Sequence, residues 1–476
     1  MNSNKYQISF HDPEGHVFEV DGRLIRGVSP KVGIRIKNFY STQLALDLVK
    51  ENWIPATWAL TASEMPANFI ENPDRDLVWF EHKKIHFISY AHEWVPEMLL
   101  AAAELTLDLA ERLHAVGWDL KDASASNVVF NGTAPVFVDI CSIIERRQDQ
   151  PYWRPKGQFE RHFILPLMAY IYRNLPPNHI HLSNSDGLNP LEISSLLGFK
   201  RWTNILGVKH CAIPVLLSKS IKSKTYNGLE VTDSKVNSIA QQWQLNSIKA
   251  SLKIIKGKLR PHATNWHTYT RERCHYSSKS IFEKREKVSK WIGAVSPCTV
   301  LDLGANTGEF SILASKLATR VIALEKDLDS ARLAYNFAKG EGSNIQVVLQ
   351  DIGNPSPSLG WRNMEKKSLV HRISGEIDCV LALALLHHWL VTAGIPLNEI
   401  LSSLAQWTKK HLIIEYIPPD DVMFQLLCTQ RELNYGWLTK SEFELKVKEF
   451  FVIEEIFLLN HGGRILYLLC KKSINN

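Results

Sequence analysis

From residue 299 to the C-terminus, short apolar runs alternate with stretches of helical periodicity, and this alternation constrains the fold more than any other feature. The runs that read as buried strands are 299–304, 320–325, 345–351, 377–385 and 411–416. The helical stretches between them are 308–318, 328–340 and 397–408. Residues 281–292, which lead into this domain, and residues 439–450 also read as helices. Repeated strand–helix units predict an α/β fold with a parallel sheet. Residues 451–459 and 464–472 read as a closing antiparallel pair.

The chain is too long for one ordinary core, since 476 residues correspond to two or three domains of roughly 100–200 residues each. The domains expected along the chain are an α+β lobe at 1–90, a mostly helical lobe at 91–218, a basic linker at 219–280 and the α/β domain at 281–476. The first two lobes are expected to contain a hairpin that turns at Asp21-Gly22, a helix at 41–53, a strand at 83–90 and a long helix at 96–117 that ends at the Gly. Residues 249–290 hold twelve Lys/Arg and three Glu, so the positive charge of the chain is concentrated there.

The N-terminus has no long apolar core, and the longest apolar stretch, 379–391, carries two His. Neither a signal peptide nor a membrane anchor is therefore expected. The seven Cys are odd in number and form no C-x-x-C pair, which argues against a zinc site or a disulfide framework. We expect a cytoplasmic protein without a bound metal.

The stretch "VLDLGANTGEF" places Asp302 and Gly304 at the carboxyl end of the first predicted strand, with Gly308 opening the next helix. Gly lets the backbone approach a ligand without a Cβ clash, and the helix N-terminus offers free N–H groups. An NAD fingerprint needs three Gly, but two of these positions are Asn306 and Glu309, and Glu309 would repel a pyrophosphate. S-adenosylmethionine (SAM) has no phosphate, and its positive methionine portion suits Asp302.

Acidic residues also end the second and third predicted strands. Glu325 is placed to accept hydrogen bonds from the ribose hydroxyls, and Asp351 from the adenine amino group. Three acids at successive strand ends are more specific than a Gly-rich loop alone, although a Rossmann-like domain for another ligand remains the alternative. The predicted cofactor site consists of Asp302, Gly304, Asn306, Gly308, Glu325, Asp351 and, at the end of the fourth strand, Ala382.

After the fourth strand the chain reads "LALALLHHWL" instead of the Asn/Asp-Pro-Pro-aromatic motif of enzymes that methylate base amines. The pair Pro297-Cys298 precedes the Gly-rich loop, so a cytosine-C5 nucleophile is not supported. Methyl transfer to a hydroxyl needs a base, and His has a suitable pKa. The predicted catalytic residues are His387, slightly preferred over His388, and Glu415, which could orient the imidazole. The alternative is a pair of packing or capping histidines.

Residues 117–140 carry a different signal, with Asp122, Asn127 and Asp139 in the order that protein kinases use. In kinases the first Asp accepts the hydroxyl proton, and the Asn and second Asp hold metal. Asp119 competes with Asp122 for the role of base. The alternative is that these residues only cap a loop and hold a hairpin.

An active kinase also needs a phosphate-covering Gly loop and a strand Lys paired with a helix Glu. The N-terminal region has no G-x-G-x-x-G, and it offers only Lys37 and Glu51 as a weak echo of that pair. We therefore expect a kinase-like or degenerate kinase fold without phosphotransfer.

Several phrases together resemble the class I SAM-dependent methyltransferases related to the rhizobial nodulation host-specificity protein: "HFISYAHEW", "LKDASASNVVFNGTAPVFVD", "QFERHFILPL", "NPSPSLGWRNMEKKSL" and "LALALLHHW". The resemblance extends over nearly the whole chain. It implies a Rossmann-like methyltransferase domain with a seven-stranded sheet behind a long N-terminal region, and it supplies no substrate. Glu160 in "QFERHF" departs from the family pattern, which has a small residue there.

We predict a SAM-dependent methyltransferase that O-methylates a saccharide or another small metabolite, with the N-terminal half positioning the acceptor. The rivals are N-methylation of a small amine, a bifunctional kinase/methyltransferase and a non-catalytic scaffold. A further rival is a nucleic-acid (RNA) methyltransferase, in which the basic linker tracks phosphates while Trp266, Tyr269 and Tyr276 stack bases. No membrane partner is expected, and the oligomeric state is left open.

Overall fold

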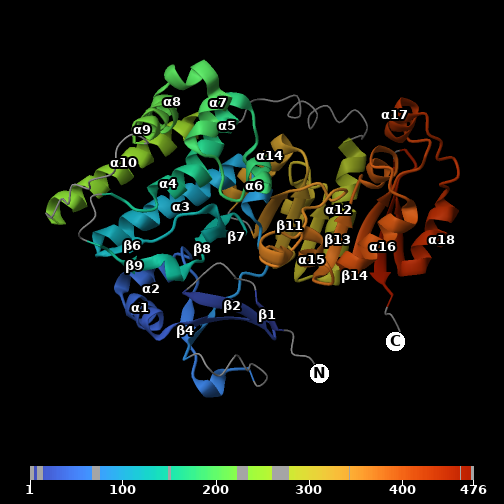
Figure 1. Ribbon diagram of the computed structural model, residues 1–476. Helices are drawn as coiled ribbons and strands as arrows, with labels where there is room; N and C mark the ends of the chain where they lie inside the picture. Colours follow the sequence, from blue (N-terminus) through green and yellow to red (C-terminus); the bar gives the residue numbers. More distant parts are fainter. Residues whose placement is uncertain are drawn as a thin grey trace. The chain divides into compact units, whose positions relative to one another are not determined.

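The computed structural model describes residues 5–7, 14–66, 76–147, 152–221, 234–259, 278–341, 344–460 and 462–472. The chain forms two compact units (Figure 1). Unit 1 comprises Met1–Arg260 with Leu359–Lys366, and unit 2 comprises Pro261–Ser358 with Lys367–Asn476. Among the helices described, none is both long and apolar enough to cross a membrane.

Unit 2 contains the predicted seven-stranded sheet, in the order β12-β11-β10-β13-β14-β16-β15. Its parallel strands are β10 (Thr299–Leu303), β11 (Arg320–Glu325), β12 (Ile345–Leu349), β13 (Ile377–Ala382) and β14 (Thr408–Tyr416). The last two strands, β15 (Phe451–Leu458) and β16 (Ile465–Lys471), pair antiparallel as expected. β10 and β12 are buried along their whole length because helices cover both faces of such a sheet.

The crossover helices follow the predicted stretches, and two further helices were not expected. The helices of unit 2 are α12 (Ser278–Val295), α13 (Glu309–Ser315), α14 (Leu328–Gly340), α15 (Leu369–Ile373), α16 (Leu397–Trp407), α17 (Val422–Arg431) and α18 (Lys440–Phe450). A π-helical turn, η9 (His388–Thr392), follows β13 directly. Such turns are rare and frequent at functional sites.

The strand order of unit 2 reverses between β10 and β13, and the loops after both strands meet there. A Cβ built on Gly304 would lie 3.2 Å from Leu385 Cδ1, so the loop after β10 lies against the loop after β13. Doubly wound sheets bind ligands at the carboxyl ends of the strands beside such a reversal. The fold therefore brings the predicted cofactor residues to one edge.

Unit 1 begins with an antiparallel sheet in the order β1-β2-β3-β5-β4. Its strands are β1 (Lys5–Gln7), β2 (Gly15–Val20), β3 (Arg23–Val28), β4 (Thr57–Ala59) and β5 (Val78–His82). Asp21 and Gly22 both have positive φ, 49° and 79°, as the predicted hairpin turn requires. The strand expected at 83–90 is wrong, because the chain leaves the sheet after His82.

Two helices lie between β3 and β4: α1 (Pro30–Tyr40), which was not predicted, and α2 (Gln43–Lys50), within the expected stretch. The short 3₁₀ turns η1 (Ala62–Glu64) and η2 (Ala91–Glu93) precede the long buried helix α3 (Pro96–Ala115), which ends before Gly117 as expected. The polar loop that follows lies between two small sheets, β6-β9 and β7-β8. Their elements are β6 (Trp118–Leu120), η3 (Ala125–Asn127), β7 (Val128–Asn131), β8 (Ala134–Phe137), η4 (Ile140–Ser142) and β9 (Ile143–Glu145).

The rest of unit 1 is helical. Its elements are α4 (Lys156–Phe159), η5 (Glu160–Ile164), α5 (Leu165–Arg173), α6 (Pro177–Ser183), α7 (Pro190–Leu197), η6 (Gly198–Trp202), α8 (Ile205–Gly207), η7 (Val208–Ala212), α9 (Ile213–Ile221) and α10 (Ser234–Lys258). The π-helical turns η5 and η7 are joined by Glu160, whose Oε1 lies 3.1 Å from Nδ1 of His210. Glu160, the residue that departs from the family pattern, therefore has a buried polar partner.

Candidate functional site

The loop between β10 and α13 takes a backbone shape that side chains other than Gly rarely adopt. Gly304, Asn306 and Gly308 have φ of 68°, 51° and 87°. Gly308 is the N-cap of α13, and a Cβ there would lie 3.3 Å from Cβ of Ala334. The glycines thus let the loop turn tightly and pass close to α14, as the sequence predicted for a loop that approaches a ligand.

Two buried acids stand beside this loop at neighbouring strand ends. Asp302 on β10 is 3% exposed, and its Oδ2 accepts a hydrogen bond of 2.6 Å from Ser311 Oγ. Glu325 on β11 is 8% exposed and accepts from the backbone N–H groups of Asn306 (2.7 Å) and Asp327 (2.8 Å). Because each carboxylate oxygen has two acceptor positions, Glu325 can still accept from a ligand.

The charge of this acid pair is not balanced by the protein. Burial and, to a smaller extent, the neighbouring Glu325 raise the pKa of Asp302 to about 7, against the opposing effects of Ser311 and Lys284. Burial also raises the pKa of Glu325. No ion pair to a Lys or Arg is formed by either acid within the described residues. A positively charged ligand would relieve this repulsion.

The other two predicted cofactor residues differ in environment. Asp351 lies just beyond β12, is exposed, and accepts a 2.8 Å hydrogen bond from the Gly353 N–H. Ala382 ends β13, is fully buried and pairs in register with Leu303 of β10. Asp351 is thus accessible to a ligand, whereas Ala382 can contribute only a small side chain to the end of the strand.

Glu415 ends β14 and holds the turn that precedes the two histidines. Its carboxylate is fully buried and accepts hydrogen bonds from Lys284 Nζ (2.6 Å) and the Ala384 N–H (2.8 Å). Arg464 lies 3.7 Å from its other oxygen. Ala384 has a φ of 52°, which is unfavourable for a residue with a Cβ. Glu415 therefore stabilises a strained turn through the backbone, a role that the sequence did not reveal.

The rings of His387 and His388 are in tilted contact at the start of η9, with centroids 4.1 Å apart and planes at 39°. His387 is 3% exposed, and its Nδ1 is buried without a hydrogen-bond partner. Burial, together with the charges of His388 and Arg464, lowers the pKa of His387 to about 3, although Glu415 and Asp421 act in the opposite direction. The imidazole is thus neutral at physiological pH, far from the ordinary pKa that recommended a histidine base.

A groove of about 520 Å³ lies next to η9 in unit 2. Leu390 of η9 lines it on one side, and Tyr435 and Trp437 line it on another. Ring contacts connect it to the histidines, because Phe424 lies 6.2 Å from His387 and 5.6 Å from Tyr435 between centroids. An acceptor bound in this groove would have aromatic surfaces beside it.

Three polar residues at this edge were missed from the sequence. Ser311 bonds to Asp302, Lys284 of α12 bonds to Glu415, and Arg464 pairs with Asp421 at 2.8 Å. Lys284 is 7% exposed in its side chain, and it comes from a segment read only as a lead-in helix. Burial of such residues depends on the packing of distant elements, so no local pattern marks them.

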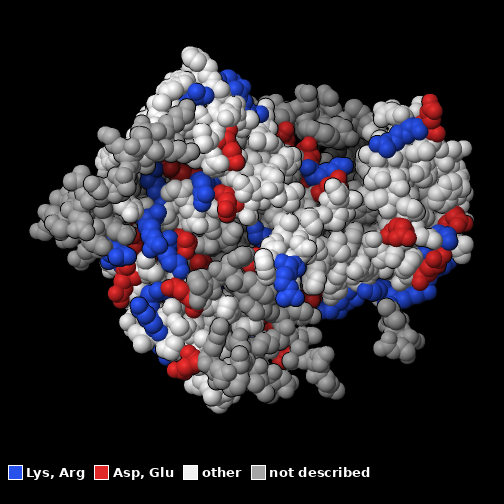
Figure 2. All heavy atoms as spheres, viewed as in Figure 1, with Lys and Arg blue, Asp and Glu red and all other residues white. Residues whose placement is uncertain are grey.

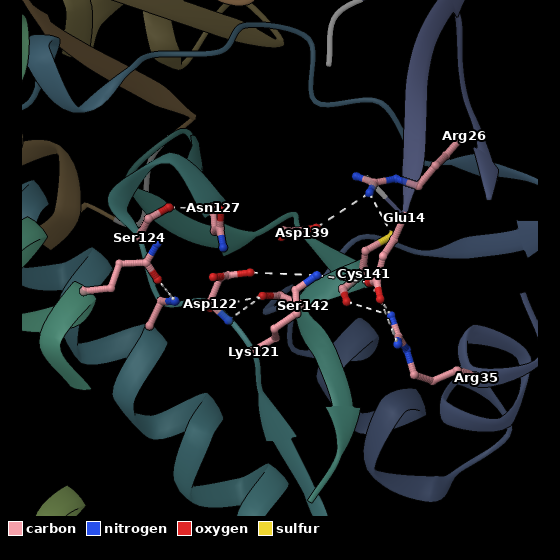
Figure 3. A network of polar contacts seen from close by, with 12 residues as sticks. Glu14, Arg26, Arg35, Lys121, Asp122, Ser124, Asn127, Asp139, Cys141 and Ser142 are labelled. Atoms are coloured by element: carbon pink, nitrogen blue, oxygen red, sulfur yellow. Dashed lines mark hydrogen bonds and ion pairs between the residues drawn. The ribbon is translucent and has the colours of Figure 1, made fainter. Parts of the chain in front are cut away.

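The kinase-like residues of unit 1 do lie near one another (Figure 3). The Val138 N–H donates to the Asn127 carbonyl (2.8 Å), and the Asp122 N–H donates to Ser142 Oγ (2.9 Å). Asp122 is in the loop after β6 and is partly exposed, whereas Asp119 is buried within β6. Of the two candidate bases, only Asp122 is therefore accessible.

Positively charged side chains pair with two acids near this loop, Asp139 and Glu14. Arg26 of β3 lies 3.6 Å from Asp139, and Arg35 of α1 bonds to Glu14 at 2.8 Å (Figure 3). Lys121 bonds to the same carboxylate of Glu14 at 3.0 Å. Burial raises the pKa of Glu14, but the bonds from Arg35 and Lys121 outweigh it and lower that pKa overall.

The Lys–Glu pair suggested by the sequence is wrong. Lys37 lies on α1 rather than on a strand, and Glu51 forms an ion pair with Arg112 at 2.6 Å. Instead, β3 carries Arg26 and the following helix α1 carries Arg35.

The basic segment 249–290 is largely balanced by acids where the structure describes it. Lys249 pairs with Asp108 and Glu111, and Lys256 pairs with Glu104. Figure 2 shows blue and red side chains interspersed on the drawn face. The predicted base-stacking residues Trp266, Tyr269 and Tyr276 lie outside the described residues.

No family model matches the chain. Over 466 residues the chain is 28% identical to the nodulation protein NoeA of Rhizobium meliloti (strain 1021). The aligned region covers 96% of this chain and 94% of NoeA. This confirms the resemblance to a nodulation protein over nearly the whole length.

Several solved structures are similar to part of the chain. PH0226 from Pyrococcus horikoshii OT3 is 18% identical, with an alignment that covers 43% of this chain and 99% of PH0226 and a TM-score of 0.31. The N-methyltransferase NodS from Bradyrhizobium japonicum WM9 has 11% identity, 41% and 99% coverage and a TM-score of 0.31. Magnesium protoporphyrin IX methyltransferase from Synechocystis PCC 6803, with bound SAH, has 18% identity, 40% and 84% coverage and a TM-score of 0.31. Because these TM-scores are low, the function proposed below rests on the sheet order and the geometry of the site.

Proposed function

We propose that the protein is a SAM-dependent methyltransferase with its cofactor site in unit 2. The observation that carries this proposal is the pair Asp302 and Glu325, two buried acids without a protein cation at the point where the strand order reverses. SAM carries an ammonium and a sulfonium but no phosphate, so it fits an acidic site whose neighbouring helix begins with Glu309.

In this proposal each cofactor residue contacts a different part of SAM. Asp302 and the loop at Gly304 and Asn306 would face the positive methionine portion, and Glu325 would accept from the ribose hydroxyls. Asp351 would accept from the adenine amino group. When bound, SAM supplies an electrophilic methyl group; the protein supplies position, exclusion of water and a place for the leaving proton.

We propose O-methylation of a saccharide or another small metabolite, with the groove beside Tyr435 and Trp437 as the acceptor site and the N-terminal half positioning the acceptor. Among the described residues Nδ1 of His387 has no hydrogen-bond partner, which supports this because that nitrogen is left to accept a hydroxyl proton, although its lowered pKa weakens it as a base. Glu415 would position that imidazole through the turn at Ala384.

Titration calorimetry with SAM tests the cofactor site. Asp302→Ala and Glu325→Ala should each weaken SAM binding by about 10–150-fold, because each removes hydrogen bonds to a charged group worth roughly 1.5–3 kcal/mol. Asp378→Asn is the matched control, since Asp378 accepts backbone N–H groups at the opposite edge of the same sheet. Full affinity in both test variants would refute the proposed site.

The acceptor is identified by untargeted metabolite profiling of a deletion strain, in which the product should be replaced by a species lighter by one methyl group. A change in an amine rather than a hydroxyl compound would favour N-methylation. Methylation found in RNA, with salt-dependent RNA binding by the protein, would favour the nucleic-acid alternative.

For unit 1 we propose a kinase-like fold without phosphotransfer. The elements occur in kinase order, from a strand with a cation to a loop with Asp122 and Asn127 and a hairpin that ends at Asp139. The carboxylate of Glu14, held by Arg35 and Lys121, favours loss of activity because it would repel nucleotide phosphates. The wild-type protein should show no magnesium-dependent ATP hydrolysis; hydrolysis that Asp122→Asn abolishes would establish a bifunctional enzyme instead.

A further inference from the structure

A second cluster of chemically reactive side chains lies in unit 2, away from the proposed cofactor site. His411 of β14, Glu454 of β15 and Cys470 of β16 each offer one ligand atom, and these three atoms all lie within 4.8 Å of one another. No other such group of three His, Cys, Asp or Glu occurs in the parts of the chain that the structure describes.

The sheet itself brings these residues together. His411 and Cys470 are direct partners in the antiparallel ladder of β14 and β16, so their side chains are on the same face. On β15 the register shifts: Ile453 pairs with Leu469 and Glu455 with the adjacent Leu468. Glu454 is thus the additional residue of a β-bulge.

A β-bulge turns a side chain out of its regular alternation and is typically a built feature of a sheet. Here the bulge leaves the Glu454 carboxylate close to His411 and Cys470 on the two neighbouring strands. The sequence alone does not reveal this set, because its members are 43 and 16 residues apart and form no C-x-x-C or H-x-x-H pattern.

The separation of His411 and Glu454 matches coordination of one metal ion better than a direct hydrogen bond. His411 Nε2 and Glu454 Oε2 are 3.6 Å apart, longer than an ordinary hydrogen bond. Zinc bonds of about 2.0–2.2 Å to N and O place two tetrahedral ligands roughly 3.3–3.5 Å apart. A neutral His, a carboxylate and a thiolate also carry two negative charges together, which balance a divalent cation.

We propose that His411, Glu454 and Cys470 bind one Zn²⁺, with water as the fourth ligand. Mixed nitrogen, sulfur and oxygen donors are the set that zinc accepts in tetrahedral geometry. Binding releases the thiol proton of Cys470 to solvent. This goes beyond the proposed methyltransferase and differs from the expectation of no metal.

The ion would link three strands and fasten the edge strand β15 to the sheet. His411 is four residues before Glu415 on β14, which corresponds to about 13 Å at roughly 3.3 Å per residue. It therefore lies nearer to the amino-terminal end of the strand, away from the proposed cofactor site. The zinc is therefore a structural clasp, and methyl transfer does not use it.

Zinc titration of the whole protein in competition with a chelator, and the absorption spectrum with Co²⁺ in place of zinc, test the proposal. One equivalent should bind, the cobalt form should show a thiolate-to-metal band, and zinc should raise the melting temperature. Glu454→Gln and Cys470→Ser should each weaken binding by at least ~100-fold, since even outer-shell changes typically cost 10–100-fold. SAM affinity should stay unchanged.

Two matched controls fix the location. Glu455→Gln changes the neighbouring carboxylate, which bonds instead to Trp291 Nε1 (2.5 Å), and Cys298→Ser changes an exposed thiol elsewhere in unit 2. Both should retain zinc and the thiolate band. A thiolate band that survives in Cys470→Ser, equal losses in Glu455→Gln and Glu454→Gln, or no stoichiometric binding would each overturn the proposal.

Discussion

The two units place acidic residues in comparable positions, next to loops that follow strands, but they treat the charge in opposite ways. In unit 1, Glu14 and Asp139 have Arg35, Lys121 and Arg26 as partners. In unit 2, Asp302 and Glu325 have hydroxyl and backbone donors but form no ion pair with a Lys or Arg among the described residues, and burial raises both pKa values.

The difference shows which site needs a ligand. The charges of Glu14 and Asp139 in unit 1 are balanced by protein cations. Unbalanced buried acids cost stability until a positive ligand arrives, and this cost is the usual sign of a functional site. This contrast supports the proposed cofactor site at the edge of unit 2, and the ion-paired network of Figure 3 offers no comparable unbalanced charge among the described residues.

The largest expected effect concerns chemistry at the edge of unit 2. If His387 accepts the acceptor proton, His387→Ala should lower methyl turnover by ~10²–10⁴-fold while SAM affinity changes little. The exposed His371 of α15 provides the control, because His371→Ala should keep full turnover. Retained turnover per folded molecule in His387→Ala would make the residue a packing histidine.

A smaller effect tests the charge comparison directly. Asp302→Asn removes an unbalanced buried charge and should stabilise the ligand-free protein at pH 8 by on the order of 1–3 kcal/mol. Asp139→Asn removes a partner of Arg26 and should destabilise it by a similar amount. Thermal unfolding of both variants measures these opposite signs. A lower melting temperature in both variants would contradict the claim that the acid in unit 2 is unbalanced and the acid in unit 1 is balanced.

The smallest effect is on the pH dependence of SAM binding. Asp302 has a pKa of about 7 in the free protein and must be ionised to attract a cation, so SAM affinity should fall by up to ~10-fold per pH unit below pH 7 and level off above it. Calorimetry from pH 5.5 to 8.5 would show this slope, and Asp302→Asn should abolish it. A flat wild-type profile would mean that the carboxyl does not face the cofactor.

The same raised pKa has a defined effect on stability. The folded state holds the Asp302 proton more tightly than the unfolded chain does between pH 3.8 and about 7, so this group's contribution to stability declines as pH rises through that window. For His387 the pKa of about 3 means that turnover at saturating SAM has no inflection near pH 6.5 from this group.

Periodicity predicted the strand segments of unit 2 and the place of the loop after β10, and the family resemblance supplied the seven-stranded sheet. The alternation of apolar runs sets which segments are strands, and Gly304 and Gly308 mark a loop whose φ values other residues avoid. These features are local, so one sequence reveals them. The strand wrongly placed at 83–90 shows the limit, because an apolar run is also buried without pairing.

What only the tertiary structure decided is which charged groups meet. Lys284 reaches Glu415 across 131 residues, and the bulge at Glu454 completes a cluster with His411 and Cys470 on two other strands. The ionisation of Asp302 and His387 likewise depends on burial among distant elements. Local propensity fixes where a strand begins and ends, but electrostatic energy depends on distances and water exclusion, which exist only once the chain has folded.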